Sequence, residues 1–138
     1  MTQKDKDLLL KDLCARLYTC NCIYGTALTV TLADEQPLVS NQWLISNYDC
    51  YKDKFIVSNI VYASDTDRIV DIDNIRPYLF PLDKINGDMW SEYLATCVGG
   101  NASFPTLKSF EWCDEHHVDY RGLIPMGLAI DATNKNIY

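Results

Sequence analysis

The first seventeen residues place apolar side chains at helical spacing. The apolar stripe consists of Leu10, Leu13, Cys14 and Leu17. Positions i, i+3, i+4 and i+7 lie on one face of a helix, so the pattern predicts a helix over 2–17. Thr2, followed three residues later by Asp5, is typical of a capping box at the start of a helix. Asp12 and Arg16 have the i,i+4 spacing of an ion pair, which we expect on the solvent-facing side.

Beyond about residue 20, apolar residues alternate with polar ones, which is the period of β-strands. Strand-like runs occupy 23–32, 42–51, 54–63 and 68–72. The run over 54–63 is the richest in β-branched and aromatic residues, which favour extended backbone. Short links join the runs. We therefore expect a small antiparallel sheet over 22–72, arranged either as an open meander or as a small SH3-like barrel.

The segment 74–82 is apolar but contains Pro77 and Pro81. Proline lacks the N–H group that a central strand uses in its ladder, and it breaks long helices. We therefore interpret this segment as an irregular apolar strap that connects the sheet to the C-terminal helices.

Two helical patterns follow the strap. The first begins near Asp88 and is ended by the glycine pair at 99–100. The second runs from Pro105, a residue suited to the first helical position, to His116. We expect its buried stripe to consist of Leu107, Phe110 and Cys113. Trp112 lies off this stripe, so we expect it to be partly exposed.

These patterns together predict a single α+β domain with an N-terminal helix, a small antiparallel sheet and a helical C-terminal third. Its expected parts are the helix over 1–19, the β-rich part with its strap over 20–82, the helical part over 83–130 and a tail over 131–138. The tail is polar, and we expect it to be mobile or only loosely docked.

The charge balance narrows the range of partners. The 138 residues include 12 basic and 19 acidic side chains, a net charge of −7. A surface of this sign repels phosphate groups, which disfavours direct binding to nucleic acid. No apolar run reaches the ~20 residues that cross a bilayer, and the region after Met1 lacks the apolar core of a signal peptide, so we expect a cytoplasmic protein without membrane contact. Its six cysteines are then expected to be reduced.

Three runs carry a resemblance to known proteins. They are KDKDLLLKDLCARL (4–17), DIDNIRPYLFPL (71–82) and HHVDYRGLIPMGLAIDA (116–132). Together they resemble a group of short uncharacterised proteins of gut anaerobes, their phages and other mobile elements. Pro125 departs from the group, whose members more often have a charged residue there. No activity is attached to this group, so the resemblance implies only a context, the cytosol of a bacterium or of a phage host.

Cys113 and His117 have the i,i+4 spacing of two zinc ligands on one helix. A structural zinc site needs four ligands, and the chain has only two histidines. We therefore interpret them as a core cysteine near a helix-end histidine and predict no metal or other cofactor. The enzymatic alternative is a cysteine nucleophile with a histidine base near His116 and an orienting carboxylate such as Asp119 or Asp114. No local motif supports it, so no catalytic residue is assigned.

An acidic cluster follows the third strand-like run. It consists of Asp65, Asp67, Asp71 and Asp73. Carboxylates at alternating positions could bind Ca²⁺ or Mg²⁺, but the glycine and distal glutamate of a calcium loop are missing. Aspartate is common in solvated turns because it hydrogen-bonds its own backbone. As an exposed patch, the cluster would attract a basic partner protein at long range.

Arg121 follows Tyr120 in a strongly acidic part of the chain. Its guanidinium could clamp a carboxylate or phosphate of a ligand. The alternative is an internal ion pair with Asp119 or Glu115, which would fix the turn after the last helix. Tyrosine and tryptophan dominate binding hot spots, which makes Tyr120 and Trp112 candidate contact residues.

The sequence therefore predicts a small non-catalytic accessory or regulatory protein that binds an unknown partner protein. Its candidate binding residues are Trp112, Tyr120, Arg121, Asp65, Asp67, Asp71 and Asp73. Three alternatives stay open: an enzyme with a site near His116–Asp119, an acidic inhibitor of a host defence nuclease, and a self-associating structural module. The oligomeric state is left open.

Overall fold

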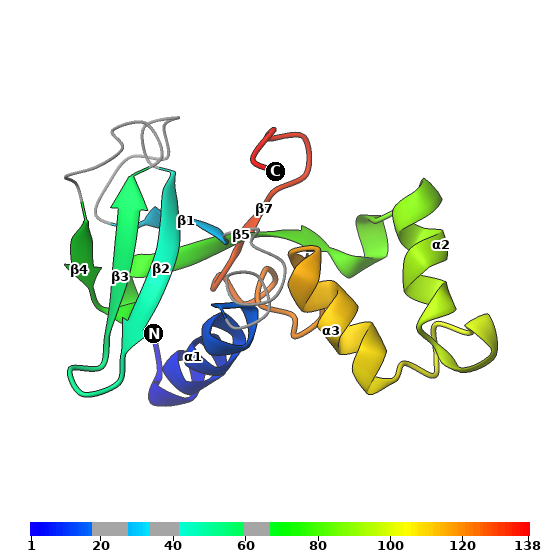
Figure 1. Ribbon diagram of the computed structural model, residues 1–138, viewed down its shortest axis with the longest axis horizontal. Coiled ribbons are helices and arrows are strands. Elements are labelled where there is room, and N and C mark those ends of the chain that lie inside the picture. The colour runs from blue at the N-terminus through cyan, green and yellow to red at the C-terminus, as the bar shows by residue number, and fades with distance from the viewer. Residues whose placement is uncertain (18–27, 34–41, 60–66) are drawn as a thin grey trace.

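A computed structural model describes residues 1–17, 28–33, 42–59 and 67–138 of the chain (Figure 1). Its helices are α1 (Gln3–Leu17), α2 (Gly87–Ala95) and α3 (Leu107–Glu115). Short 3₁₀ turns occupy Ile72–Asn74, Leu82–Lys84 and Val98–Gly100. The strands are β1 (Thr29–Leu32), β2 (Trp43–Asp49), β3 (Lys54–Asn59), β4 (Arg68–Val70), β5 (Ile75–Pro81), β6 (Val118–Asp119) and β7 (Ile130–Asp131). The architecture is α+β, as the sequence predicts.

The strands form one mixed sheet in the order β4-β3-β2-β1-β5-β6, with β7 also paired to β5. Strands β1 to β5 pair antiparallel, whereas β6 and β7 each pair parallel to β5. Among the described strands, β4 and β6 are the ends of this order and do not pair, so the sheet is not closed into an SH3-like barrel. Residues 23–27 and 60–63 of the predicted strand runs lie outside the described residues.

The expected strap is in fact strand β5, and this prediction was wrong. β5 runs along the long axis of the molecule, with β2, β3 and β4 toward one end and α2 and α3 toward the other (Figure 1). It pairs with β1 through 75–77 and with β7 and β6 through 78–81. Pro77 and Pro81 are therefore the last residues of separate ladders, where a missing N–H group interrupts no continuous row of hydrogen bonds.

Helix α1 begins with the predicted capping box. The Asp5 amide donates to Oγ1 of Thr2 at 3.1 Å, and the Thr2 amide donates to the Asp5 carboxylate at 3.2 Å. Its most buried stripe is Leu9, Asp12, Leu13 and Arg16, one position away from the predicted one. The Asp12–Arg16 ion pair, expected on the solvent side, is fully buried. The reason is that α1 contacts both the sheet and α3, so that more than one side of the helix is covered.

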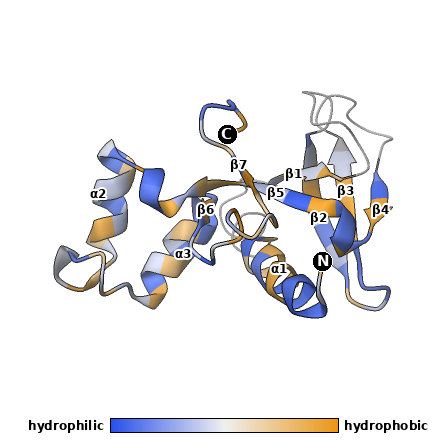
Figure 2. Ribbon diagram, turned by 180° about the vertical axis from the view of Figure 1, so that it is seen from behind, coloured by the Kyte–Doolittle hydropathy of each residue, from blue (hydrophilic) through white to orange (hydrophobic). Residues whose placement is uncertain are grey.

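Helices α2 and α3 begin within two residues of the predicted positions. The first residue of α2 is Gly87, and Asn86 precedes it. Thr106 caps α3, one residue after Pro105, and forms a capping box with Ser109. Figure 2 shows hydrophobic and hydrophilic stretches mixed along all three helices, as in amphipathic helices at a surface.

The buried stripe of α3 differs from the predicted one. Leu107 and Phe110 are 73% and 38% exposed, whereas Trp112 is 8% exposed, so Trp112 is a core residue. Ser109 is fully buried because its hydroxyl hydrogen-bonds the Thr96 carbonyl at 3.1 Å. A small, satisfied polar residue at the contact with α2 thus takes the place of a larger apolar one.

Buried apolar residues form two clusters. The first joins Leu9 and Leu13 of α1 to the sheet. The second surrounds Tyr93 and Trp112 between α2, α3 and β6. Strand β5 connects the two clusters, because it contributes Leu79 to the first and packs Phe80 against the second. None of the helices in the described part of the chain has the length and apolar character that a bilayer span requires.

The expected loose tail is docked through Tyr138. Its hydroxyl donates to the Tyr78 carbonyl at 2.9 Å and accepts from the Thr29 amide at 3.1 Å. Its ring stacks on the imidazole of His117, with centroids 3.9 Å apart and planes 7° apart. The final residues therefore pack against both β1 and β5.

Candidate functional site

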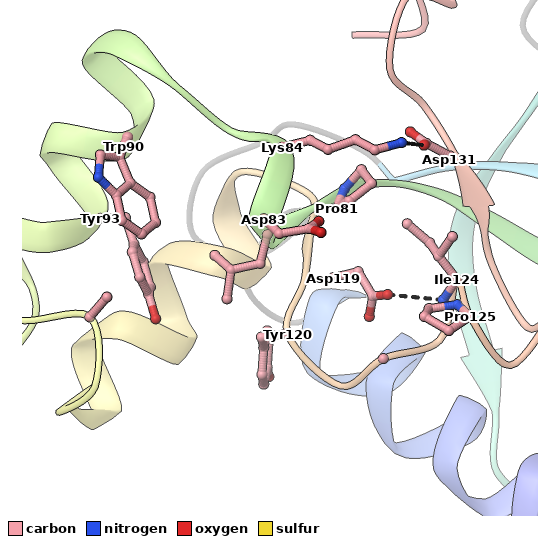
Figure 3. Close-up of a pocket in the computed structure, with 13 residues that line it drawn as sticks. Pro81, Asp83, Lys84, Trp90, Tyr93, Asp119, Tyr120, Ile124, Pro125 and Asp131 are labelled. Carbon is pink, nitrogen blue, oxygen red and sulfur yellow. Dashed lines mark hydrogen bonds and ion pairs between the residues drawn. The ribbon is translucent and has the colours of Figure 1, made fainter.

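A cavity of about 580 Å³ opens between α2 and the turn that follows β6. We call it the α2 cavity. The described residues that line it are Pro81, Leu82, Asp83, Lys84, Trp90, Tyr93, Ala102, Asp119, Tyr120, Gly122, Ile124, Pro125 and Asp131. Figure 3 shows Trp90 and Tyr93 on one side, Ile124 and Pro125 on the opposite side, and Asp83 between them.

The turn over 119–125 forms one wall, and Asp119 fixes its shape. The Asp119 carboxylate accepts hydrogen bonds from the amides of Leu123 and Ile124, each at 2.9 Å. Gly122 has φ +76°, a conformation that favours glycine. With each oxygen bound to a backbone amide, the Asp119 carboxylate holds the wall in place.

Aromatic rings supply much of the cavity surface. Trp90 and Tyr93 lie on one face of α2 with ring centroids 5.7 Å apart. Across the cavity, Tyr120 stacks on Phe110 of α3 at 5.1 Å. The Arg121 guanidinium covers the Tyr120 ring at 4.4 Å, so this ring is held on two sides. Rings held by their neighbours lose little conformational freedom when a partner binds.

The charged residues at the cavity are mainly acidic. Asp131 forms an ion pair with Lys84 at 2.9 Å. Burial raises the pKa of Asp131, but hydrogen bonds from Thr133 and the ion pair with Lys84 outweigh it and bring that pKa down to about 2. Asp83 is exposed at the cavity and carries a further carboxylate. The cavity therefore has mainly apolar walls, with negatively charged side chains at its edge.

For Arg121 the sequence left open a ligand clamp and an internal ion pair with Asp119 or Glu115, and the structure shows an internal ion pair with other partners. Arg121 donates to the Asp12 carboxylate of α1 at 2.7 Å, and its Nη1 lies 3.8 Å from the Asp114 carboxylate. Neither Asp119 nor Glu115 is its partner. The guanidinium thus holds the cavity wall against α1, and Arg121 is not among the described lining residues.

The same carboxylate binds Arg16, which is fully buried. Arg16 donates to both oxygens of Asp12 at 2.8 and 3.1 Å. It also donates to the Cys113 and Val118 carbonyls at 3.3 and 2.8 Å. We call Asp12, Arg16 and Arg121 the buried charge cluster. It connects α1 to α3, to β6 and to the cavity wall.

Of the candidate metal and catalytic residues, Asp119 lines the cavity, whereas the candidate thiol and histidines are not among the described lining residues. His117 is buried against Tyr138, and His116 lies with Nδ1 2.9 Å from the Trp112 carbonyl oxygen. Cys113 is fully buried, and burial raises the pKa of its thiol to about 12, so it is protonated at neutral pH. Within residues 1–17, 28–33, 42–59 and 67–138, no three metal-ligating side chains of His, Cys, Asp or Glu converge. No histidine or cysteine is among the described lining residues.

The acidic cluster of the sequence lies at the sheet end of the molecule, away from the cavity. Asp71 pairs with Lys54, and Asp73 pairs with Lys6 at 3.1 Å. Asp67 accepts a hydrogen bond from the Ser58 hydroxyl at 2.7 Å. Asp65 lies outside the described residues. The described members are thus exposed and bound to neighbouring side chains, as in a solvated turn.

Of the predicted binding residues, the structure brings Tyr120 to the cavity and places Arg121 and Trp112 directly behind its walls. The binding residues predicted from the sequence do not include Trp90, Tyr93, Ile124 and Pro125, which also line the cavity. A signal was present for the first two, because Trp90 and Tyr93 are aromatic and have the i,i+3 spacing of one helix face. The other two lie in a turn whose approach to α2 depends on contacts distant in sequence.

Comparison with protein-family models, curated proteins and solved structures found no match to this chain. Inference about function therefore rests on the geometry and charge of the α2 cavity.

Proposed function

We propose that this chain is a small non-catalytic binding protein, and that the α2 cavity receives an apolar side chain of a partner protein. The observation that carries the proposal is the lining of the cavity. Aromatic and aliphatic side chains from α2, β5 and the 119–125 turn line an open cavity of about 580 Å³, within the range of about 300–1,000 Å³ typical of ligand sites.

The residue types support recognition of a protein. Tryptophan and tyrosine are the commonest hot-spot residues of protein interfaces, and Trp90, Tyr93 and Tyr120 face one chamber. Trp90 and Tyr120 are only partly buried, so each offers ring surface to a partner. Removing such surface from water is the main source of affinity at the centre of an interface.

The polar groups at the cavity favour binding over chemistry. Asp119 is bound by two backbone amides and Asp131 by Lys84. No histidine or cysteine accompanies these carboxylates among the described lining residues, so no pair of nucleophile and base faces the cavity there. A protonated Cys113 thiol outside the cavity is likewise a poor nucleophile. These arrangements hold the walls in position, as a binding site requires.

A blocking substitution tests the proposal. Ala102 is exposed and lines the cavity, so Ala102→Trp fills it without disturbing a core. Peptides are first selected from a displayed random library against the unmodified protein, and their dissociation constants are then measured. We expect Ala102→Trp to weaken binding at least about tenfold, since a hot-spot contact exceeds 1.4 kcal/mol.

The matched control is Ser46→Trp on β2, which is exposed and lies toward the other end of the molecule. This variant should bind the same peptides with unchanged affinity. The proposal is wrong if the library yields no binding peptide, or if Ala102→Trp binds as well as Ser46→Trp does.

A further inference from the structure

An exposed apolar patch adjoins the α2 cavity. We call it the α3 patch, and its members are Val98, Phe104, Leu107 and Phe110, which are 61%, 57%, 73% and 38% exposed. Phe104 lies two residues after Ala102, which lines the cavity, and its carbonyl accepts a hydrogen bond from Val98 at 2.9 Å. Phe110 stacks on Tyr120, another lining residue. Apolar surface therefore continues from the cavity onto the outer side of α3.

Such a surface is larger than a single anchoring side chain requires. Isolated exposed apolar residues are ordinary, but a group beside an apolar cavity marks an interaction surface. An anchor in the cavity would leave the residues on either side of it within reach of the α3 patch. The patch thus calls for a partner segment with more than one apolar side chain.

The charge around this surface indicates the chemistry of the partner. Residues 83–131 contain eight acidic and three basic side chains, a balance of −5 within the chain's −7. Asp83, Asp88, Glu92 and Glu111 are exposed. Two of the three basic side chains are engaged, since Lys84 binds Asp131 and Arg121 binds Asp12. The part of the molecule that forms the cavity and the patch therefore carries most of the negative charge.

We propose that the α2 cavity and the α3 patch together bind a basic segment of a partner protein, with one apolar side chain in the cavity and another on the patch. This inference rests on the proposed function and adds the chemical class of the partner. Complementary charge speeds the encounter and selects the orientation, while the apolar contacts provide affinity. A second copy of this chain is a poorer occupant, because two acidic surfaces would then face each other.

The composition of the selected peptides is the first test. We expect peptides recovered from the random library to be enriched in Lys and Arg and to contain at least two apolar residues. Their affinity should fall at least tenfold between ionic strengths of about 0.01 M and about 1 M, where the Debye length shortens from about 30 Å to about 3 Å. Enrichment in acidic or uncharged peptides, or an affinity that does not depend on salt, would overturn the inference.

The second test separates the patch from the cavity. Leu107→Ser should weaken binding of the selected peptides several-fold, because its side chain is 73% exposed and belongs to the patch. The matched control is Ile69→Ser on β4, which is 63% exposed and lies at the other end of the molecule. Equal affinities for the two variants would overturn the role of the patch.

The outcomes distinguish this inference from the proposed function. Uncharged peptides that bind and are blocked by Ala102→Trp would leave the proposed function standing and refute the basic partner. Dimerisation in sedimentation velocity that is lost in Leu107→Ser would show that a second copy of the chain occupies the surface, and would also refute it.

Discussion

Arg16 lies in the protein interior with its charge balanced. Its guanidinium is fully buried and makes four hydrogen bonds, two to Asp12 and two to backbone carbonyls. Asp12 in turn accepts a hydrogen bond from Arg121. A buried charge is tolerated only when its partners are in place, so each member of the buried charge cluster depends on the others.

Replacing Arg16 by methionine should be strongly destabilising. Arg16→Met leaves Asp12 in the interior with only Arg121, and removing one partner of a buried ion pair costs about 3–5 kcal/mol. The measurement is the free energy of unfolding in urea. Lys54→Met is the matched control, because the Lys54–Asp71 pair is exposed and such pairs contribute at most about 1 kcal/mol. Equal losses in the two variants would contradict the assignment.

His117 makes stability depend on pH. Burial, followed by the proximity of Arg16 and His116, lowers the pKa of His117 from its ordinary value of 6.5 to about 3. Below pH 6.5 the His117 imidazole of the unfolded chain takes up a proton, whereas the buried imidazole of the folded chain stays neutral until the pH approaches 3. The stabilisation is therefore complete above pH 6.5 and is lost as the pH falls toward 3.

His117→Asn tests this dependence. Asparagine accepts the positive φ of 60° found at this position. The unmodified protein should lose up to about 1.4 kcal/mol of unfolding free energy per pH unit through this residue as the pH falls below 6.5, and the variant should lose correspondingly less. Urea unfolding between pH 7 and pH 4 measures the difference. Parallel curves for the two proteins would exclude His117 as the source.

The sequence predicted contacts between residues that are close together in the chain, but not contacts between residues that are far apart in it. The Thr2–Asp5 capping box needs only four consecutive residues, so the sequence shows it. The burial of Asp12 depends on Arg121, which is 109 residues away along the chain. No periodicity carries that information, which explains why Asp12 and its neighbour Arg16 were expected on the solvent-facing side of the helix.

At the level of elements, α3 shows how tertiary contacts select the face of a helix that is buried. Leu107 and Phe110 are more apolar than Ser109, yet Ser109 is inside. Its hydroxyl reaches the end of α2, where it binds Thr96, while Trp112 packs against Tyr93 with ring centroids 5.8 Å apart. The sequence correctly predicted the helix, but its contacts with α2 determined which of its faces is buried.

A pair of alanine substitutions checks this rotation. Trp112→Ala should cost about 3–5 kcal/mol of unfolding free energy, because it leaves a cavity in the second apolar cluster. Leu107→Ala should change stability by no more than about 0.5 kcal/mol, because that side chain is on the surface. Thermal and urea unfolding give both values. If Leu107→Ala lowered the free energy of unfolding more than Trp112→Ala, the buried face of α3 would be the one that the sequence predicts.

Strand β5 shows the limit of residue propensity for predicting strands. Two prolines argue against a strand when each is considered alone. They are tolerated here because the strand changes partners between Pro77 and Tyr78. Whether a proline falls at the end of a ladder depends on which strands pair, and that depends on the whole fold.

At the scale of the molecule, the two apolar clusters are linked by β5 and by the buried charge cluster. Arg16 extends from α1, in the first cluster, to carbonyls of Cys113 and Val118 in the second. One cluster can unfold alone only if these links are broken, and breaking them costs free energy. When that cost is large, the two clusters unfold together. We therefore expect the described part of the chain to unfold in one step.

Single-tryptophan variants test this cooperativity. Trp43 belongs to the first cluster and Trp112 to the second. Replacing the other two tryptophans by phenylalanine leaves one fluorescent probe in each variant. In both variants the fluorescence midpoint in urea should coincide with the midpoint measured by circular dichroism. Separate midpoints in either variant would show that the two clusters unfold independently.

The α2 cavity itself could not be predicted from the sequence. Its walls come from β5, α2, the loop before α3 and the turn after β6. Tyr120 was identified by residue type, but its position opposite Trp90 and Tyr93 depends on parallel pairing of β5 with β6. Charge and aromatic content predicted a binding protein, whereas the location of the surface required the fold.

The buried charge cluster has a consequence for the evolution of this chain. Asp12, Arg16 and Arg121 meet at one largely buried site, with the Asp114 carboxylate 3.8 Å from Arg121, so these positions are expected to change together. A homologue with an apolar residue in place of Asp12 should also have uncharged residues in place of Arg16 and Arg121, because an isolated guanidinium in the interior is too costly to persist. A substitution of Asp12 in α1 would then be accompanied by a substitution of Arg121. Arg121 is 109 residues further along the chain and holds the wall of the α2 cavity.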